Sequence, residues 1–178
     1  AKKPLQPDLW KFPAYAGGMI DVDSNPLLAP SSLPYGLPDY SSIAPAHYLP
    51  AFMEGFARHR SEIDAIVADE SAPTFENTIV ALERAGELLG QVARTFYTVS
   101  SADASPEIQE IEETLAPLMA AHHDAVQLDG ALFARVRAVF DSRDEHALSA
   151  EERYLVERRF REMAHAGAGL DDAEKQQL

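Results

Sequence analysis

The clearest helix start in this chain is the sequence Ala72-Pro73-Thr74-Phe75-Glu76-Asn77-Thr78-Ile79-Val80-Ala81-Leu82-Glu83-Arg84-Ala85-Gly86. Pro73 favours an extended entry, and the Thr74 hydroxyl can cap the helix by accepting a hydrogen bond from a first-turn N–H. Glu76 then lies in the first turn, where the helix dipole favours a negative charge. Spacings of four and three residues predict one helix from 75 to 96, with the stripe Phe75, Ile79, Leu82, Gly86, Leu89, Ala93 and Phe96.

Two members of this stripe, Gly86 and Ala93, are small. Small side chains allow two helices to approach closely, so we expect a close helix crossing at this place. Without such a contact, Gly86 inside a helix would cost about 1 kcal/mol relative to alanine.

The segments after Pro45 all repeat with a helical period, and none alternates with the period of a strand. The first predicted helix covers residues 45–67 with Pro50 in its first turn, where a missing N–H costs nothing. It carries the stripe Leu49, Phe52, Phe56, His59, Ile63 and Ile66. A break over residues 100–104 is expected to end the second helix.

A third helix is predicted to start at Ser105-Pro106-Glu107, where a cap, a proline and an acid occupy preferred positions. Pro117 lies inside this helix, so a kink is expected near Glu113. The helix is expected to end at Asp129-Gly130. Its stripe is Ile108, Ile111, Leu115, Leu118, His122 and Ala125.

Two further helices, and the start of another, follow in the sequence. A short fourth helix carries Leu132, Phe133, Val136, Val139 and Phe140. Ser149-Ala150-Glu151-Glu152 is a capping box that starts a fifth helix, and Gly167 is its expected end. Asp171-Asp172-Ala173-Glu174 begins a sixth helix with less than two turns before Leu178, so we expect a fragment truncated in its sixth helix. The predicted fold is an all-α, up-and-down array of five to six helices.

The first 44 residues have a different composition, which predicts an extended N-terminal arm. Eight of the 12 prolines in the chain lie between positions 4 and 45, and this density blocks both helices and strands. Gly17-Gly18-Met19 is typical of a linker followed by a start methionine. Two alternatives therefore stay open for residues 1–18, an expression-derived leader or a native extension. The predicted organisation is a leader (1–18), an extended arm (19–44) and a helical domain (45–178).

The composition is that of an acidic protein with one core. The formal charge of −14 argues against partners that are themselves acidic, namely nucleic acids and membrane surfaces. The chain has no cysteine, which excludes disulfides and is compatible with a reducing compartment. No apolar run approaches the roughly 18 residues of a membrane span. A cytoplasmic protein is expected.

The six histidines do not form a recognisable metal motif. A zinc peptidase helix needs two histidines four residues apart with a glutamate after the first, and no pair here has that spacing. His122 and His123 point about 100° apart on a helix, so His122 is interpreted as a residue at the edge of the core. His59 is interpreted as a hydrogen-bonded buried imidazole.

Charged residues on the helices are interpreted as solvated faces. Glu162-x-x-His165 is a single Glu-x-x-His element, whereas helical di-iron sites need two such elements and two further glutamates. Acidic residues form one face at Glu110, Glu112 and Glu113, and paired charges form another at Arg153, Arg158, Arg159, Arg161, Glu151, Glu152, Glu157 and Glu162. The residues alone predict no catalytic site, no metal site and no identifiable substrate-binding residue.

Several segments in the same order carry a family resemblance. They are Asn25-Pro26-Leu27-Leu28, Leu33-Pro34-Tyr35, Tyr48-Leu49-Pro50-Ala51-Phe52, the stretch 72–86, Leu115-Ala116-Pro117, Leu148-Ser149 to Leu155-Val156, and Ala166-Gly167-Ala168-Gly169-Leu170. Together they resemble the N-terminal helical domain of peptidyl-dipeptidases, which are zinc peptidases of the thimet oligopeptidase family.

This resemblance implies a large helical enzyme with zinc, in which two helical halves flank a deep channel. Zinc, its ligands and the catalytic glutamate would lie in a later catalytic domain, which would be the partner of this segment. The enzyme would release dipeptides from the C-terminus of short peptides. This segment would form part of the channel wall and be inactive alone.

Two alternatives remain open from the residues. One is a stand-alone helical domain that binds a partner or serves as a scaffold. The other is a metal-binding helical bundle, which stoichiometric iron or zinc in the purified chain would support.

Overall fold

The structure is a computed structural model that describes residues 24–170 and residue 174. Within these residues the chain is all-α and has no strand, which confirms the predicted fold class. The expected leader over residues 1–18 and, apart from Glu174, the expected sixth helix lie outside the described residues. No helix in the described part of the chain is long and apolar enough to cross a membrane.

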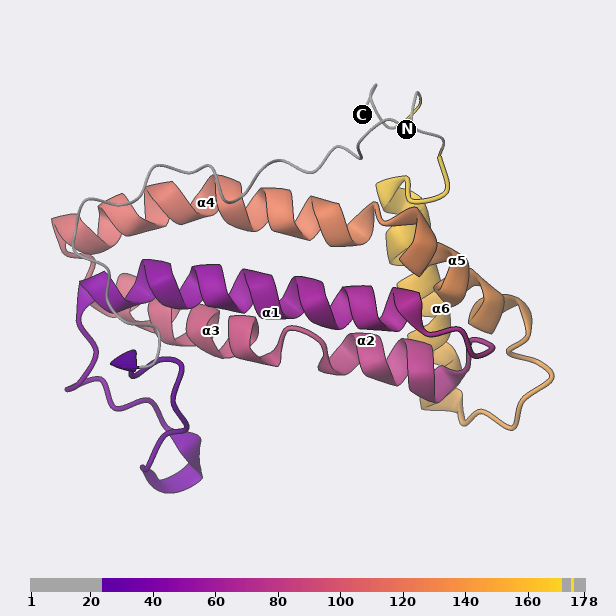
Figure 1. Ribbon diagram of the computed structural model, residues 1–178, viewed down its shortest axis with the longest axis horizontal. Helices are drawn as coiled ribbons and strands as arrows, with labels where there is room; N and C mark the ends of the chain where they lie inside the picture. The colour runs from indigo at the N-terminus through magenta and orange to yellow at the C-terminus, as the bar shows by residue number, and fades with distance from the viewer. Residues whose placement is uncertain (1–23, 171–173, 175–178) are drawn as a thin grey trace.

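Among the described residues, five helices are 12 to 22 residues long (Figure 1). They are α1 (Tyr48–Ala68), α3 (Glu87–Ala102), α4 (Pro106–Gln127), α5 (Gly130–Asp141) and α6 (Ala150–Ala166). A π-helix (Phe75–Val80) and the short α2 (Ala81–Arg84) precede α3, and 3-10 turns lie at Pro34–Gly36 and Pro45–His47. Figure 1 shows α1, the α2–α3 segment and α4 running along the long axis, with α5 and α6 at one end.

The helix starts predicted from sequence are confirmed. The Thr74 hydroxyl accepts from the N–H of Asn77 at 3.1 Å, and the Asn77 side chain accepts in return from the N–H of Thr74 at 2.7 Å. Ser105 caps α4, and Ser149 forms the predicted capping box with Glu152 at the start of α6. The end of α6 is also as predicted, because Gly167 adopts a left-handed conformation with φ of 97°.

The boundaries of α3 and α4 differ slightly from the prediction. α3 continues to Ala102, so the break between the two helices is shorter than the expected 100–104. α4 remains helical through Pro117 and ends at Gln127. Asp129 belongs to the next helix rather than to the end of α4, because its carboxylate caps α5 through the N–H groups of residues 131 and 132, both at 3.0 Å.

The prediction of one helix from 75 to 96 is wrong at Gly86. The segment breaks there, since Ala85 is extended with ψ of 141° and Gly86 is left-handed with φ of 79°. The N–H of Gly86 donates to the Glu62 carboxylate of α1 at 2.6 Å. A contact with α1 therefore fixes the break, which Figure 1 shows between α2 and α3.

The expected close helix crossing exists, but it is centred on Gly55 of α1 rather than on a helical Gly86. A Cβ added to Gly55 would lie 3.1 Å from the Cα of Leu89 in α3. Backbone contact at this distance leaves no room for a side chain, so α1 and α3 approach through this glycine. Sequence analysis did not single out Gly55, because it lies beside the apolar stripe of its helix.

The buried side chains form two clusters, and α1 contributes to both. In the first cluster, Phe52 and Phe56 of α1 pack with residues of α3 and α4, and the Phe52 and Phe96 rings meet edge to face at 5.7 Å. In the second, Ile63 and Ile66 of α1 pack with the π-helix, α5 and α6. α1 therefore connects the two ends of the molecule.

Candidate functional site

Two histidines on different helices meet between the two clusters. The Nε2 atom of His122 in α4 lies 2.9 Å from the Nδ1 atom of His59 in α1. The His122 ring also packs against Phe56, with ring centroids 4.8 Å apart. This contact confirms that His122 lies at the edge of the core and that His59 is hydrogen-bonded, although His59 is half-buried rather than buried as expected. It also shows that the two histidines are partners.

The environment of this pair favours the neutral form of both imidazoles. Burial lowers the pKa of His122 to about 4, and the neighbouring His59 and Arg60 act in the same direction. Burial also lowers the pKa of His59, although Glu62 opposes the shift. A neutral pair can share one proton as donor and acceptor. The pair therefore joins α1 to α4, and no third side chain that could complete a metal site accompanies it among the described residues.

A hollow of about 770 Å³ lies between α4 and α6. Its lining includes His123 and Asp124 of α4 and Arg158, Arg159 and Glu162 of α6. The charged groups of α6 already bind one another, because Glu162 accepts from Arg158 at 2.7 Å and from Arg159 at 3.0 Å. The hydrogen bond from Arg158 is also the main reason why the pKa of Glu162 is lowered.

The Glu162-x-x-His165 element therefore takes part in ion pairs on the surface of α6. Glu162 is occupied by two arginines, and His165 is exposed. The predicted pairing of charges on this helix is confirmed by a further bond, from Arg161 to Glu157 at 2.5 Å. Arg159 additionally bonds Glu83 of α2, so part of this surface ties α6 to its neighbour.

The described part of the arm is fastened to the helices at its beginning. Asn25 is only 1% exposed, and its amide donates to the carbonyl of His47 at 2.9 Å while its side-chain oxygen accepts from the N–H of Leu27 at 3.0 Å. The Leu27 side chain is buried in the first cluster. The described part of the arm contains several turns and a 3-10 helix (Pro34–Gly36) rather than being extended throughout, and it is packed on the domain at its beginning.

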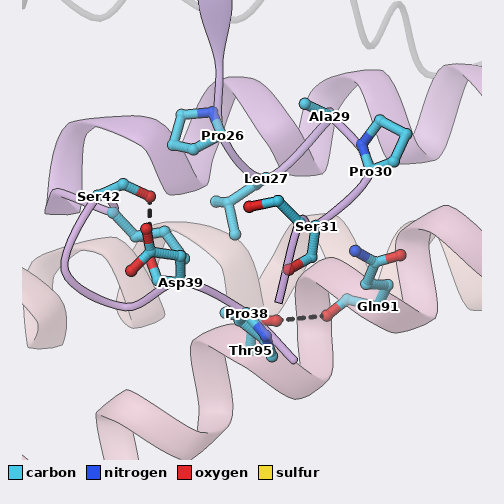
Figure 2. A pocket seen from close by; sticks show the side chains of 12 residues that line it. Pro26, Leu27, Ala29, Pro30, Ser31, Pro38, Asp39, Ser42, Gln91 and Thr95 are labelled. Atoms are coloured by element: carbon cyan, nitrogen blue, oxygen red, sulfur yellow. Dashed lines mark hydrogen bonds between the residues drawn. The ribbon is translucent and has the colours of Figure 1, made fainter. Parts of the chain in front are cut away.

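A second, smaller hollow of about 160 Å³ lies where the arm passes over α3 (Figure 2). The arm contributes prolines and serines, and α3 contributes Gln91 and Thr95. The wall is held by local bonds, since the hydroxyl of Ser42 donates to the carbonyl of Asp39 at 2.8 Å and that of Thr95 to the carbonyl of Gln91 at 2.9 Å. A volume of this size holds about one side chain and is smaller than a typical small-molecule site.

Sequence analysis did not predict this hollow or the fixed course of the arm. One signal in the sequence could have indicated a packed arm, namely the near absence of charge: Asp39 is the only Asp, Glu, Lys or Arg between residues 24 and 47.

The acidic residues of α4 do not all belong to a solvated face, as the sequence interpretation had it. Glu112 accepts a hydrogen bond from the Ser100 hydroxyl at 2.5 Å and so joins α4 to α3.

No protein-family model matches the chain. Comparison with curated proteins finds the dipeptidyl carboxypeptidase of Escherichia coli, 41% identical over 154 residues that make up 86% of this chain and 23% of that protein. The dipeptidyl carboxypeptidase of Salmonella typhimurium is 40% identical over 157 residues, 88% of this chain and 23% of the relative. Oligopeptidase A of Escherichia coli is 29% identical over 154 residues, which make up 86% of this chain and 22% of that protein.

Over most of its length the chain is related to dipeptidyl carboxypeptidase and oligopeptidase A, which confirms the resemblance noted from the sequence. Its identity with the dipeptidyl carboxypeptidases is higher than with the oligopeptidases A. The chain spans less than a quarter of the length of these curated relatives.

Proposed function

We propose that this chain is the N-terminal, non-catalytic domain of a zinc-dependent oligopeptidase of the peptidyl-dipeptidase type. The observation that carries the proposal is the 41% identity with a dipeptidyl carboxypeptidase over 154 residues. The described residues contain no group of three or more side chains that could hold a metal. Zinc and the catalytic glutamate would then lie in another part of the same polypeptide.

The contribution of this domain would be steric. A rigid wall beside the catalytic centre admits an extended peptide and excludes a folded protein. Two features of the structure support a rigid wall, namely the direct contact of α1 with α3 at Gly55 and the single helix α1 that enters both buried clusters. Short peptides are the proposed substrates, and dipeptides released from their C-termini are the proposed products.

The first experiment compares this chain with the complete polypeptide that contains it. The complete polypeptide should release C-terminal dipeptides from short peptides, lose this activity with a chelator and regain it with zinc. This chain alone should be inactive, and its circular dichroism should not change with the chelator. A complete polypeptide that cleaves no short peptide in the presence of zinc would refute the proposal and favour a binding or scaffold domain.

The steric role needs its own test. One cleavable C-terminal sequence is presented in three ways, as a free peptide, at the end of a short tail on a folded protein, and at the end of a long unfolded tail on the same protein. A wall that gates access predicts cleavage of the free peptide and the long tail but not of the short tail. Equal cleavage of all three substrates would show that no wall restricts entry.

A further inference from the structure

Exposed apolar side chains gather on one loop of the arm. Of the seven large apolar residues that are exposed in the described part of the chain, four lie within eight positions of one another. They are Leu33, Tyr35, Leu37 and Tyr40, and Tyr35 is 99% exposed. The other three, Tyr97, Tyr154 and Leu170, lie apart in the sequence. Scattered exposed apolar residues are normal, whereas a cluster indicates a contact surface.

The surroundings of this loop are almost free of charge. Asp39 is the only Asp, Glu, Lys or Arg from residue 24 to residue 47, although such residues make up 25% of the whole chain. The centres of protein interfaces are depleted of charged residues and enriched in tyrosine. The composition of the loop is therefore that of an interface rather than of a solvated surface.

The loop is also held in one shape before any partner binds. The hydroxyl of Ser31 donates to the carbonyl of Leu37 at 2.5 Å and accepts from the N–H of Leu33 at 3.1 Å. The N–H of Leu37 donates to the carbonyl of Pro34 at 3.3 Å. These bonds hold Tyr35 in a left-handed conformation with φ of 61°. A preformed loop loses little conformational entropy when it binds.

We propose that Leu33, Tyr35, Leu37 and Tyr40, together with the 160 Å³ hollow beside them, form the surface that contacts the rest of the same peptidase polypeptide. This inference rests on the proposed function. The curated relatives are more than four times as long as the segment that matches them, so most of the polypeptide available for contact lies outside this structure. An uncharged, apolar segment of it would cover the loop, with one side chain in the hollow.

The observations favour this occupant over two others. A dimer built on one eight-residue loop would fall short of the roughly 1,200–2,000 Å² that stable complexes bury, whereas a covalently linked partner needs less area because its effective concentration is high. A peptide substrate would cover the surface only briefly. Between turnovers four apolar side chains would face water, which exposes a protein to aggregation.

Footprinting of tyrosines by hydroxyl radicals tests the proposal. In the complete polypeptide without any peptide, Tyr35 and Tyr40 should be oxidised at least fivefold more slowly than in this chain alone. Buried Tyr48 should stay unreactive in both proteins, which shows that the domain is folded. Equal oxidation of Tyr35 in both proteins would overturn the proposal.

Two further arms separate the other occupants. Protection of Tyr35 in this chain alone that grows with its concentration would identify a second copy as the partner. Protection of the complete polypeptide only after a short peptide is added, with zinc chelated to prevent cleavage, would identify a substrate surface. Either result overturns the proposal.

A variant pair gives an independent readout. Tyr35→Ser combined with Leu37→Ser should leave the melting temperature of this chain unchanged but lower that of the complete polypeptide, and Tyr154→Ser serves as the matched control on α6. An unchanged melting temperature of the complete polypeptide would overturn the proposal. Zinc-dependent cleavage of short peptides is measured on the same samples. A complete polypeptide that is active but does not protect Tyr35 refutes only the contact surface. A complete polypeptide that protects Tyr35 but is inactive refutes only the proposed function.

Discussion

Two glycines four residues apart should respond in opposite ways to the same substitution. Gly86 is left-handed at the break between α2 and α3, whereas Gly90 lies inside α3. We expect Gly86→Ala to destabilise the chain and Gly90→Ala to stabilise it. The pair is well matched, because both variants add one methyl group to the same short segment.

The magnitude at Gly86 follows from three contributions. A left-handed conformation costs an alanine roughly 1–2 kcal/mol, and the smaller entropy of the unfolded chain offsets roughly 0.4–1 kcal/mol of this. The new Cβ would also lie 3.0 Å from Nδ1 of His59, whose ring is held by its bond to His122. Relief of that contact costs roughly a further 1 kcal/mol or more. The net loss is about 1–3 kcal/mol.

At Gly90 the same substitution is expected to raise the free energy of unfolding. An added Cβ would meet only the end of the Arg94 side chain, at 3.1 Å, and this flexible group can move away. Alanine is favoured over glycine inside a helix by up to about 1 kcal/mol. The free energies of unfolding of the two variants should therefore differ by about 1–4 kcal/mol.

Urea denaturation of this chain, followed by circular dichroism at 222 nm, measures both values. Thermal unfolding should agree, with a midpoint about 2–12 °C lower for Gly86→Ala in a domain of this size. If both substitutions stabilised the chain, Gly86 would lie in a continuous helix, as the apolar periodicity alone had predicted. That result would refute the assignment of the break to contacts with α1.

Three further substitutions test other contacts of the domain. The folded-state pKa of His122 is about 4, below its ordinary value of 6.5, so the unfolded chain takes up protons first as the pH falls. Urea titrations should therefore show about 2 kcal/mol less stability at pH 5 than at pH 7. His122→Gln should remove most of that difference. Asn77→Ala breaks the reciprocal cap at the start of the π-helix and should cost about 1–2 kcal/mol in the same assay, whereas no loss would show that the cap is unimportant. Arg135→Met leaves the carbonyls of Asp69 and Ser71 without their buried donor and should cost about 1–3 kcal/mol; a melting temperature equal to that of the parent chain would contradict this role.

The features predicted correctly from sequence are those that neighbouring residues determine. The caps at Thr74, Ser105 and Ser149 were predictable, because a side chain there bonds to a backbone group three residues away. The left-handed end of α6 was predictable for the same reason, since Gly167 directly follows the last helical turn. Local chemistry therefore determines where most helices begin and end.

The break at Gly86 was missed because its cause is distant in sequence. Leu82 and Leu89 keep their helical spacing on either side of it, so the apolar stripe gives no sign of the interruption. The contacts that fix Gly86 come from Glu62 and from His59 on α1. The histidine pair was missed for a similar reason, because each imidazole was interpreted alone and the partner lies 63 residues away.

These distant contacts also join the two buried clusters into one unit. Gly86 separates the part of the chain that enters the second cluster, through Ile79, from α3, which enters the first through Phe96. A break of this kind could act as a hinge if nothing spanned it. α1 spans it as a continuous helix, and it holds the break directly through the bond from Gly86 to Glu62. The wall proposed above would have to resist bending, and α1 would supply that resistance where the α2–α3 segment is interrupted at Gly86.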